Sequence, residues 1–131
     1  MSQRNLERFQ EGLAAWNRRD FEAILNLCAP DVEWTFSNTF PDATGAIKGR
    51  DEIRKFLHQF ADDWSEIAIV PHQVVDPGDH VVADVQFVAT GRDGIEVSMR
   101  FGHVWTERDG EIVGFRAYPS FDEALADVQS T

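Results

Sequence analysis

Cysteine and basic residues are scarce in this sequence of 131 residues. The single cysteine, Cys28, excludes a disulfide within the chain, and no segment has the composition of a signal peptide, so we expect a cytoplasmic protein. Twelve Lys and Arg residues stand against 23 Asp and Glu residues, which gives a net charge of −11. A field of this sign repels phosphate backbones and anionic lipid surfaces, and no apolar run is long enough to span a bilayer. These properties argue against nucleic-acid and membrane partners.

The motifs of several chemistries are also absent from the sequence. No spacing of His, Cys, Asp and Glu fits a metal site, and there is neither a glycine-rich phosphate loop nor a G-x-S-x-G nucleophile elbow. We therefore predict that the protein uses no metal and no cofactor. Aromatic side chains, by contrast, are abundant, with ten Phe and four Trp. The remaining composition is that of a globular protein and predicts one domain over residues 1–131.

The first half of the chain has helical periodicity. Apolar residues from Leu6 to Trp16 are spaced three and four apart, which predicts one helix. Asp20 has the position of an N-cap for a second, short helix, which Pro30 is expected to end. The clearest pattern predicts a third helix, with Asp51 and Glu52 in its first turn. Its apolar stripe consists of Ile53, Phe56, Leu57, Phe60, Ala61 and Trp64.

Strands are predicted before and after this third helix. Residues 32–36 alternate between apolar and polar, and residues 37–49 are expected to form a long loop that serves as a rim or lid. After residue 66 the period changes to two, and Pro71 indicates an edge strand or a bulge. Turn residues then separate strands over 80–90, 95–107 and 111–118. Ser120 and Glu123 form a capping box that opens a short terminal helix. Helices followed by antiparallel strands predict an α+β fold, with helices on one face of a curved sheet.

Several short segments stand out together with the order of these elements. They are residues 15–21, 29–34, 49–53, 100–105, 109–113 and 116–118. The segments and the element order resemble the SnoaL-like branch of the nuclear transport factor 2-like (NTF2-like) superfamily. The resemblance implies a cone-shaped fold in which N-terminal helices pack on the concave face of a curved, mostly antiparallel sheet and enclose a pocket. The superfamily includes isomerases, cyclases, epoxide hydrolases, dehydratases and non-catalytic modules, so it does not fix a function.

The best-known catalytic sets of the superfamily are not matched by this sequence. In the resemblance to steroid isomerases, the positions of the Asp base, the oxyanion Tyr and the protonated Asp fall on Phe36, Gly12 and Gly102. The epoxide hydrolases need an Asp after the arginine of the last strand, where Arg116 is followed here by Ala117. Neither mechanism is therefore expected. SnoaL-type cyclases use an Asp acid or base with a histidine nearby.

The strand predicted over 95–107 carries both candidate catalytic residues, Arg100 and His103. They lie on opposite faces, because successive side chains of a strand alternate. The apolar neighbours of His103 place its face in the interior, whereas the steroid-isomerase resemblance places the Arg100 face in the pocket and makes the other face a dimer surface. A β-bulge would exchange the two faces, so the sequence leaves both arrangements open. The plain alternatives are a structural histidine and a surface arginine paired with an acid.

Eight further residues are candidates for binding a ligand. They are apolar or aromatic and are expected to face inward, and the resemblance places Trp16 and Trp34 at pocket-lining positions. A cavity with such walls suits a small apolar or aromatic molecule. The alternative for each is ordinary hydrophobic core. The candidates are Trp16, Trp34, Phe36, Phe56, Val85, Phe87, Phe115 and Ala117.

Two functions from different classes follow from these observations. The first is a small-molecule-binding SnoaL-like domain that catalyses a cofactor-independent acid–base step, such as an isomerisation, cyclisation or dehydration. The alternative is a non-catalytic ligand-binding or dimeric interaction module. A carboxylate within hydrogen-bond reach of the cavity would favour the enzyme, and a wholly apolar or collapsed cavity would favour the alternative. In both cases we predict a homodimer through the sheet face, because an apolar stripe on a curved sheet needs covering.

Overall fold

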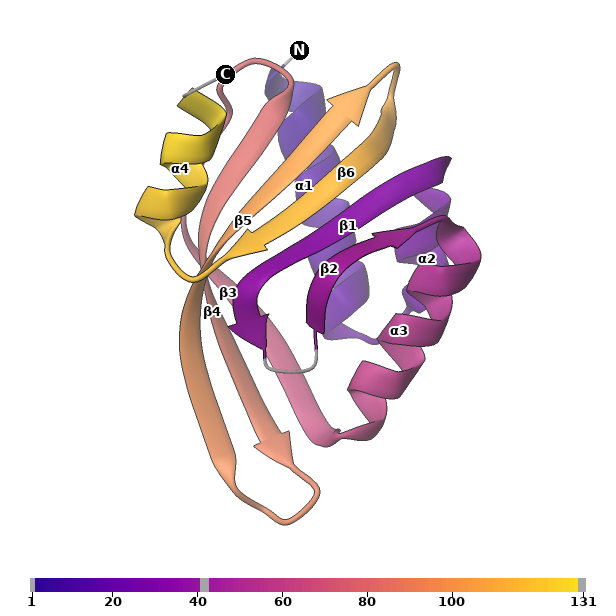
Figure 1. Cartoon of the computed structure of the whole chain (residues 1–131), viewed down its shortest axis with the longest axis vertical. Coiled ribbons are helices and arrows are strands. Elements are labelled where there is room, and N and C mark those ends of the chain that lie inside the picture. The colour runs from indigo at the N-terminus through magenta and orange to yellow at the C-terminus, as the bar shows by residue number, and fades with distance from the viewer. Residues whose placement is uncertain (1, 41–42, 130–131) are drawn as a thin grey trace.

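Ten helices and strands follow one another along the computed structural model, which describes residues 2–40 and 43–129. They are α1 (Ser2–Asn17), α2 (Phe21–Asn26), β1 (Cys28–Phe40), β2 (Ala43–Lys48), α3 (Arg50–Asp62), β3 (Trp64–Val75), β4 (His80–Gly91), β5 (Glu96–Arg108), β6 (Glu111–Tyr118) and α4 (Phe121–Gln129). The strands form one sheet in the order β2-β1-β6-β5-β4-β3. Neighbouring strands are antiparallel except for β1 and β6, which are parallel. The predicted α+β architecture is confirmed (Figure 1).

Local sequence signals explain several element ends. The side chain of Asp20 accepts a hydrogen bond of 3.2 Å from the backbone N–H of Ala23, so Asp20 caps α2 as predicted. Ser120 accepts one of 3.1 Å from the backbone N–H of Glu123 at the start of α4. Strand β3 lies at the edge of the sheet, and its register shifts between Pro71 and Gln73, as the proline indicated.

Three predicted boundaries were wrong, each because tertiary pairing replaced a local signal. Helix α2 ends at Asn26 and not at Pro30, since Cys28 already pairs with Ile112 of β6. Helix α3 ends at Asp62, so Trp64 begins β3 instead of closing the helix. The loop expected over 37–49 is largely a hairpin, in which β1 continues to Phe40 and β2 pairs with it from residue 43. Only residues 41–42 of that segment lie outside the described chain.

The two faces of the sheet have separate hydrophobic cores. Helices α1, α2 and α3 cover one face and enclose the larger core, whereas α4 covers the other face (Figure 1). The smaller core joins Val82 and Val104 of the sheet to Ala124 and Val128 of α4. Gly102 makes this packing possible, because a Cβ atom there would lie 2.2 Å from the carbonyl oxygen of Ser120.

The orientation of β5 follows from these two cores. Phe101, His103 and Trp105 point toward the helices, and Gly102 and Val104 point toward α4. The register with β4 is regular from Glu96 to Thr106, and the irregularity against β6 comes only after Thr106, so no bulge exchanges the two faces at Arg100 or His103. The structure therefore places the His103 face inside, which was one of the two arrangements that the sequence left open.

Candidate functional site

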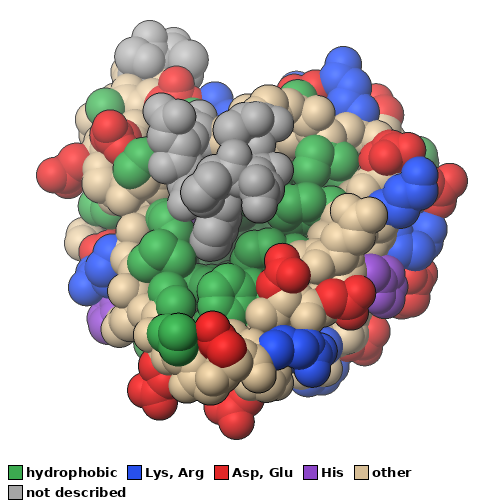
Figure 2. Space-filling model, turned by 60° about the horizontal axis from the view of Figure 1, so that its bottom comes forward, with side chains coloured by type: hydrophobic (Ala, Val, Ile, Leu, Met, Phe, Trp, Pro, Cys, Tyr) green, Lys and Arg blue, Asp and Glu red, His purple; other side chains and the backbone are tan. Residues whose placement is uncertain are grey.

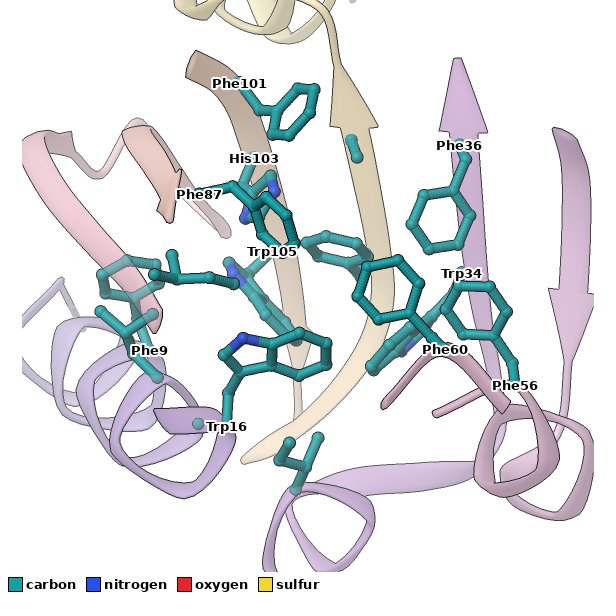
Figure 3. A pocket seen from close by; sticks show the side chains of 16 residues that line it. Phe9, Trp16, Trp34, Phe36, Phe56, Phe60, Phe87, Phe101, His103 and Trp105 are labelled. Atoms are coloured by element: carbon teal, nitrogen blue, oxygen red, sulfur yellow. The ribbon is translucent and has the colours of Figure 1, made fainter. Parts of the chain in front are cut away.

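An internal cavity of about 70 Å³ lies between the helices and the concave face of the sheet. Figure 3 shows aromatic side chains from α1, α3 and four strands pointing toward one another around it. In Figure 2, hydrophobic side chains gather around a hollow in the surface of the molecule. Roughly 10–15 Å³ of such volume holds one water molecule, so the cavity has room for about five waters or one aromatic ring.

Seven of the eight predicted ligand-binding residues line this cavity. The exception is Val85, which is fully buried in the core beside it. The seven are Trp16, Trp34, Phe36, Phe56, Phe87, Phe115 and Ala117. The lining also includes residues that no sequence pattern distinguishes from ordinary core, namely Phe9, Gly12, Leu13, Ile24, Phe60, Ile69, Phe101 and Trp105. A helical or alternating stripe identifies inward-facing residues, but it does not show where the packing leaves space.

Contacts between rings hold the cavity walls in place. Phe115 lies at the centre of one wall, with its ring centroid 5.1 Å from that of Trp34 and 4.6 Å from that of Trp105. On a second wall, which joins the first through the contact of Phe36 with Phe115 at 6.0 Å, the ring of Phe56 lies 5.0 Å from Phe36 and 5.8 Å from Phe60. Such tilted and offset pairs add attraction beyond the burial of area. The residues of the second wall are only half-buried, so this wall borders the surface.

Trp16 is positioned by a specific link between α1 and β3. The side chain of the next residue, Asn17, donates a hydrogen bond of 3.1 Å to the carbonyl of Ile69. It also accepts one of 2.8 Å from the backbone N–H of Ile69. This pair fixes the end of α1 against the sheet, and the Trp16 ring packs against Phe21 and Phe60 at about 6 Å.

His103 is the titratable side chain among the described residues that line the cavity. Only 9% of its surface is exposed, and its ring meets the edge of Phe115 at a centroid distance of 4.8 Å and an interplanar angle of 83°. Burial lowers the pKa of His103 to about 3, so the imidazole is neutral at physiological pH. Among the described residues the histidine side chains that form hydrogen bonds are His72 and His80, and the ring nitrogens of His103 form none there.

Two indole groups add unpaired donors to the lining. The N–H groups of Trp16 and Trp105 are buried and have no hydrogen-bond partner among the described residues. The Trp34 indole N–H has no hydrogen-bond partner among the described residues either, but it lies close enough to the thiol of Cys28 to lower the pKa of that group, so it is not a wholly free donor. Burial raises the pKa of Cys28 to about 12, which makes this thiol an unreactive core group, as expected.

Arg100, the second candidate catalytic residue, does not line the cavity. It is exposed on the outer face of β5. Its guanidinium donates two hydrogen bonds, of 3.1 and 2.6 Å, to the carboxylate of Asp84 on β4. A surface ion pair with an acid was the expected alternative to a catalytic role for Arg100. The structure thus does not bring Arg100 and His103 together.

The chemistry of the cavity is limited by its composition. No Asp, Glu, Lys or Arg is present among the described lining residues. Within the same part of the chain, no group of three His, Cys, Asp or Glu side chains could hold a metal ion. None of the described helices is long and apolar enough to cross a membrane. The lining therefore offers apolar contact, three N–H donors and one imidazole acceptor.

Comparison with known proteins shows what this chain is similar to. The sequence model of the SnoaL-like domain family matches residues 7–115. None of the curated proteins matches the sequence. Among solved structures, an NTF2-like protein of unknown function from Burkholderia pseudomallei is similar at 25% identity and a TM-score of 0.80, covering 94% of this chain and 95% of that one.

Two further structures cover nearly the same extent. TerC, co-crystallised with polyporic acid, has 25% identity and a TM-score of 0.80, over 98% of this chain and 99% of that one. An NTF2-like protein from Burkholderia thailandensis has 28% identity and a TM-score of 0.77, over 91% and 95% of the two chains. The cone-shaped architecture expected from the sequence is thus confirmed by structural similarity.

Proposed function

The chain belongs to the SnoaL-like domain family, and from this premise we propose that residues 1–131 form one domain that binds a small, mostly apolar aromatic molecule. The observation that carries the proposal is the internal cavity, whose walls are mostly aromatic and otherwise apolar except for His103. Closely packed cores rarely keep voids larger than a water molecule, so a space of this size is better explained by a ligand. The crystal structure of TerC with polyporic acid supports the same view, because that chain matches this one over nearly its whole length.

We propose binding without catalysis as the principal function. General acid–base catalysis works best when the pKa of the catalytic group lies near the working pH. The pKa of His103 is about 3, which makes its imidazole a weak base. No carboxylate among the described lining residues could assist it. A cofactor-independent isomerase or cyclase is the second candidate, favoured by the position of His103 in the cavity wall.

We also propose a cytoplasmic homodimer, but on different grounds from those of the sequence. The apolar stripe of β5, which we expected a second copy to cover, lies inside the protein against the helices. On the outer face of the sheet, Val70 and Val88 are 42% and 40% exposed beside the Asp84–Arg100 pair. These two side chains are the apolar contacts that the outer face offers to a second copy.

The experiment that tests ligand binding uses α-methylstyrene, an uncharged molecule with one ring, added to ¹⁵N-labelled protein. We expect saturable shifts of the indole N–H signals of Trp16, Trp34 and Trp105, and smaller shifts for Trp64, which does not line the cavity. An absence of saturable shifts up to the solubility limit would contradict the proposal.

Two variants of α1 provide the matched comparison for this experiment. Gly12 lines the cavity, and a Cβ atom there would meet only a Leu27 methyl at 3.8 Å, so Gly12→Leu should fill the space. We expect α-methylstyrene to bind this variant at least roughly tenfold more weakly. Ala14→Leu adds the same side chain at an exposed position of the same helix and should bind like the wild type. Thermal unfolding of both variants checks that they are folded.

A further inference from the structure

We propose that the cavity selects uncharged aromatic molecules that carry one carbonyl-type oxygen, and that His103 is the residue that binds this oxygen. This inference rests on the proposed binding function and adds the chemical class of the ligand.

The charge of the lining argues against an ionic ligand. A charge that is taken out of water without a partner is costly, and no Asp, Glu, Lys or Arg is present among the described lining residues. Arg100 cannot serve as a counter-ion, because it is bound to Asp84 on the outer face. The net charge of −11 adds a long-range field that disfavours an anion further. A carboxylate or an ammonium group is therefore expected to bind poorly.

The polar groups of the lining favour a hydrogen-bond acceptor on the ligand. A neutral imidazole has one donor and one acceptor, and on His103 neither takes part in a hydrogen bond within the described chain, where the histidines that do are His72 and His80. Trp105, two residues further on the same face of β5, and Trp16 on α1 each add an unpaired indole N–H. Donors thus outnumber acceptors, which matches an oxygen such as that of a ketone or ester.

The arrangement of the walls gives the ligand one orientation. Figure 3 shows His103 and Trp105 on one side of the pocket and Phe36 and Phe56 on the other, with the Trp16 ring between the two sides. The first pair carries nitrogen atoms, whereas the second pair is hydrocarbon. An aromatic ketone would place its oxygen toward His103 and Trp105 of β5 and its ring toward Phe36 and Phe56.

The size of the cavity limits the ring system. A volume of about 70 Å³ has room for about five water molecules, which together occupy roughly the space of one aromatic ring. Larger ring systems would need the half-buried side chains of Phe36 and Phe56 to move outward. Acetophenone, with one ring and one carbonyl oxygen, is therefore the simplest probe of the inferred class.

The test compares three probes of similar size at pH 7.5: acetophenone, its hydrocarbon isostere α-methylstyrene, and benzoate. We expect the wild type to bind acetophenone roughly three to ten times more tightly than α-methylstyrene, the range for one neutral hydrogen bond. Benzoate should bind at least roughly tenfold more weakly than α-methylstyrene. In His103→Phe the advantage of acetophenone should disappear while α-methylstyrene still binds. His72→Phe changes an exposed histidine and serves as the control.

Each outcome has a distinct meaning. If benzoate is the tightest ligand, or if His103→Phe keeps the preference for acetophenone, the inference is wrong. If α-methylstyrene binds but acetophenone binds no better, the inference fails and the proposed binding function stands. If none of the three probes binds the wild type, the binding function itself fails. Should His103→Phe not fold, the ¹⁵N signals of the His103 ring in the wild type decide, since acetophenone must shift them and α-methylstyrene must not.

Discussion

The buried neutral state of His103 makes the fold sensitive to acid. Burial lowers the pKa of His103 to about 3 in the folded protein, whereas the same side chain titrates near 6.5 in an unfolded chain. Because the unfolded state takes up the proton first, the stabilisation is fully present above about pH 6.5. It is lost progressively as the pH falls toward the folded pKa of about 3.

The size of the effect can be worked out at pH 5.0. The unfolded side chain is then almost fully protonated and the folded one almost fully neutral, which lowers the free energy of unfolding by about 2 kcal/mol relative to pH 7.5. This value hardly depends on the folded pKa as long as that pKa lies below about 4. A loss of this size is a substantial part of the stability of a typical domain, about 5–15 kcal/mol.

Urea unfolding at pH 7.5 and pH 5.0 measures this loss in the wild type and in His103→Phe. We expect the wild type to lose about 2 kcal/mol more than the variant between the two pH values. Burial also lowers the pKa of His80, but that contribution is present in both proteins and cancels in the comparison. His72→Phe, which removes an exposed imidazole, shows the effect of the substitution itself. Equal losses in the wild type and His103→Phe would refute the argument that His103 is buried in its neutral form.

Three further predictions concern other parts of the fold. Tyr118 is the sole tyrosine, and its burial together with a hydrogen bond of 2.6 Å to Asp127 raises its pKa to about 12. Ultraviolet titration should show this value and a lower one in Asp127→Asn, whereas a wild-type midpoint near 10 would contradict it. Gly102→Ala forces a methyl group against the Ser120 carbonyl and should cost about 2 kcal/mol in urea unfolding; an unchanged midpoint would disprove the close packing of α4. Gly12→Ala should raise the free energy of unfolding by about 1 kcal/mol through helix propensity, and a loss would show that the position is sterically closed.

Elements with strong periodicity were predictable from the sequence, and elements made by pairing were not. The stripe of α3 and the alternation of β6 place these elements within a few residues of where the structure has them. Strand β2 was missed, because its side chains show no alternation that could indicate a buried face. It exists because residues 45–48 pair with the predicted strand at Glu33 to Phe36. Such a partner is not visible in the local sequence.

For the candidate site, side-chain alternation could predict which face of a strand a residue lies on, but not which residues line the cavity. Alternation places His103 on an apolar face, and the structure has it there. The steroid-isomerase resemblance suggested the other face, but Gly102 of that face packs beneath α4 and Arg100 pairs with Asp84. Which inward-facing residues line a space, and which simply fill the core like Val85, depends on how the helices pack on the sheet.

Several features of the cavity cost stability that a filled core would keep. A glycine inside α1 costs about 1 kcal/mol, and a space of about 70 Å³ costs roughly 2 kcal/mol in lost packing. The unpaired indole N–H groups of Trp16 and Trp105 add to this, since a buried donor without a partner costs about 1–3 kcal/mol. Larger apolar residues at Gly12 and His103 would remove most of these costs without changing the fold. One ligand with a ring and an oxygen would offset all of them at once, because the ring fills the space and the oxygen pairs with the donors. For this reason we expect acetophenone to stabilise the wild type against unfolding more than α-methylstyrene does at the same concentration.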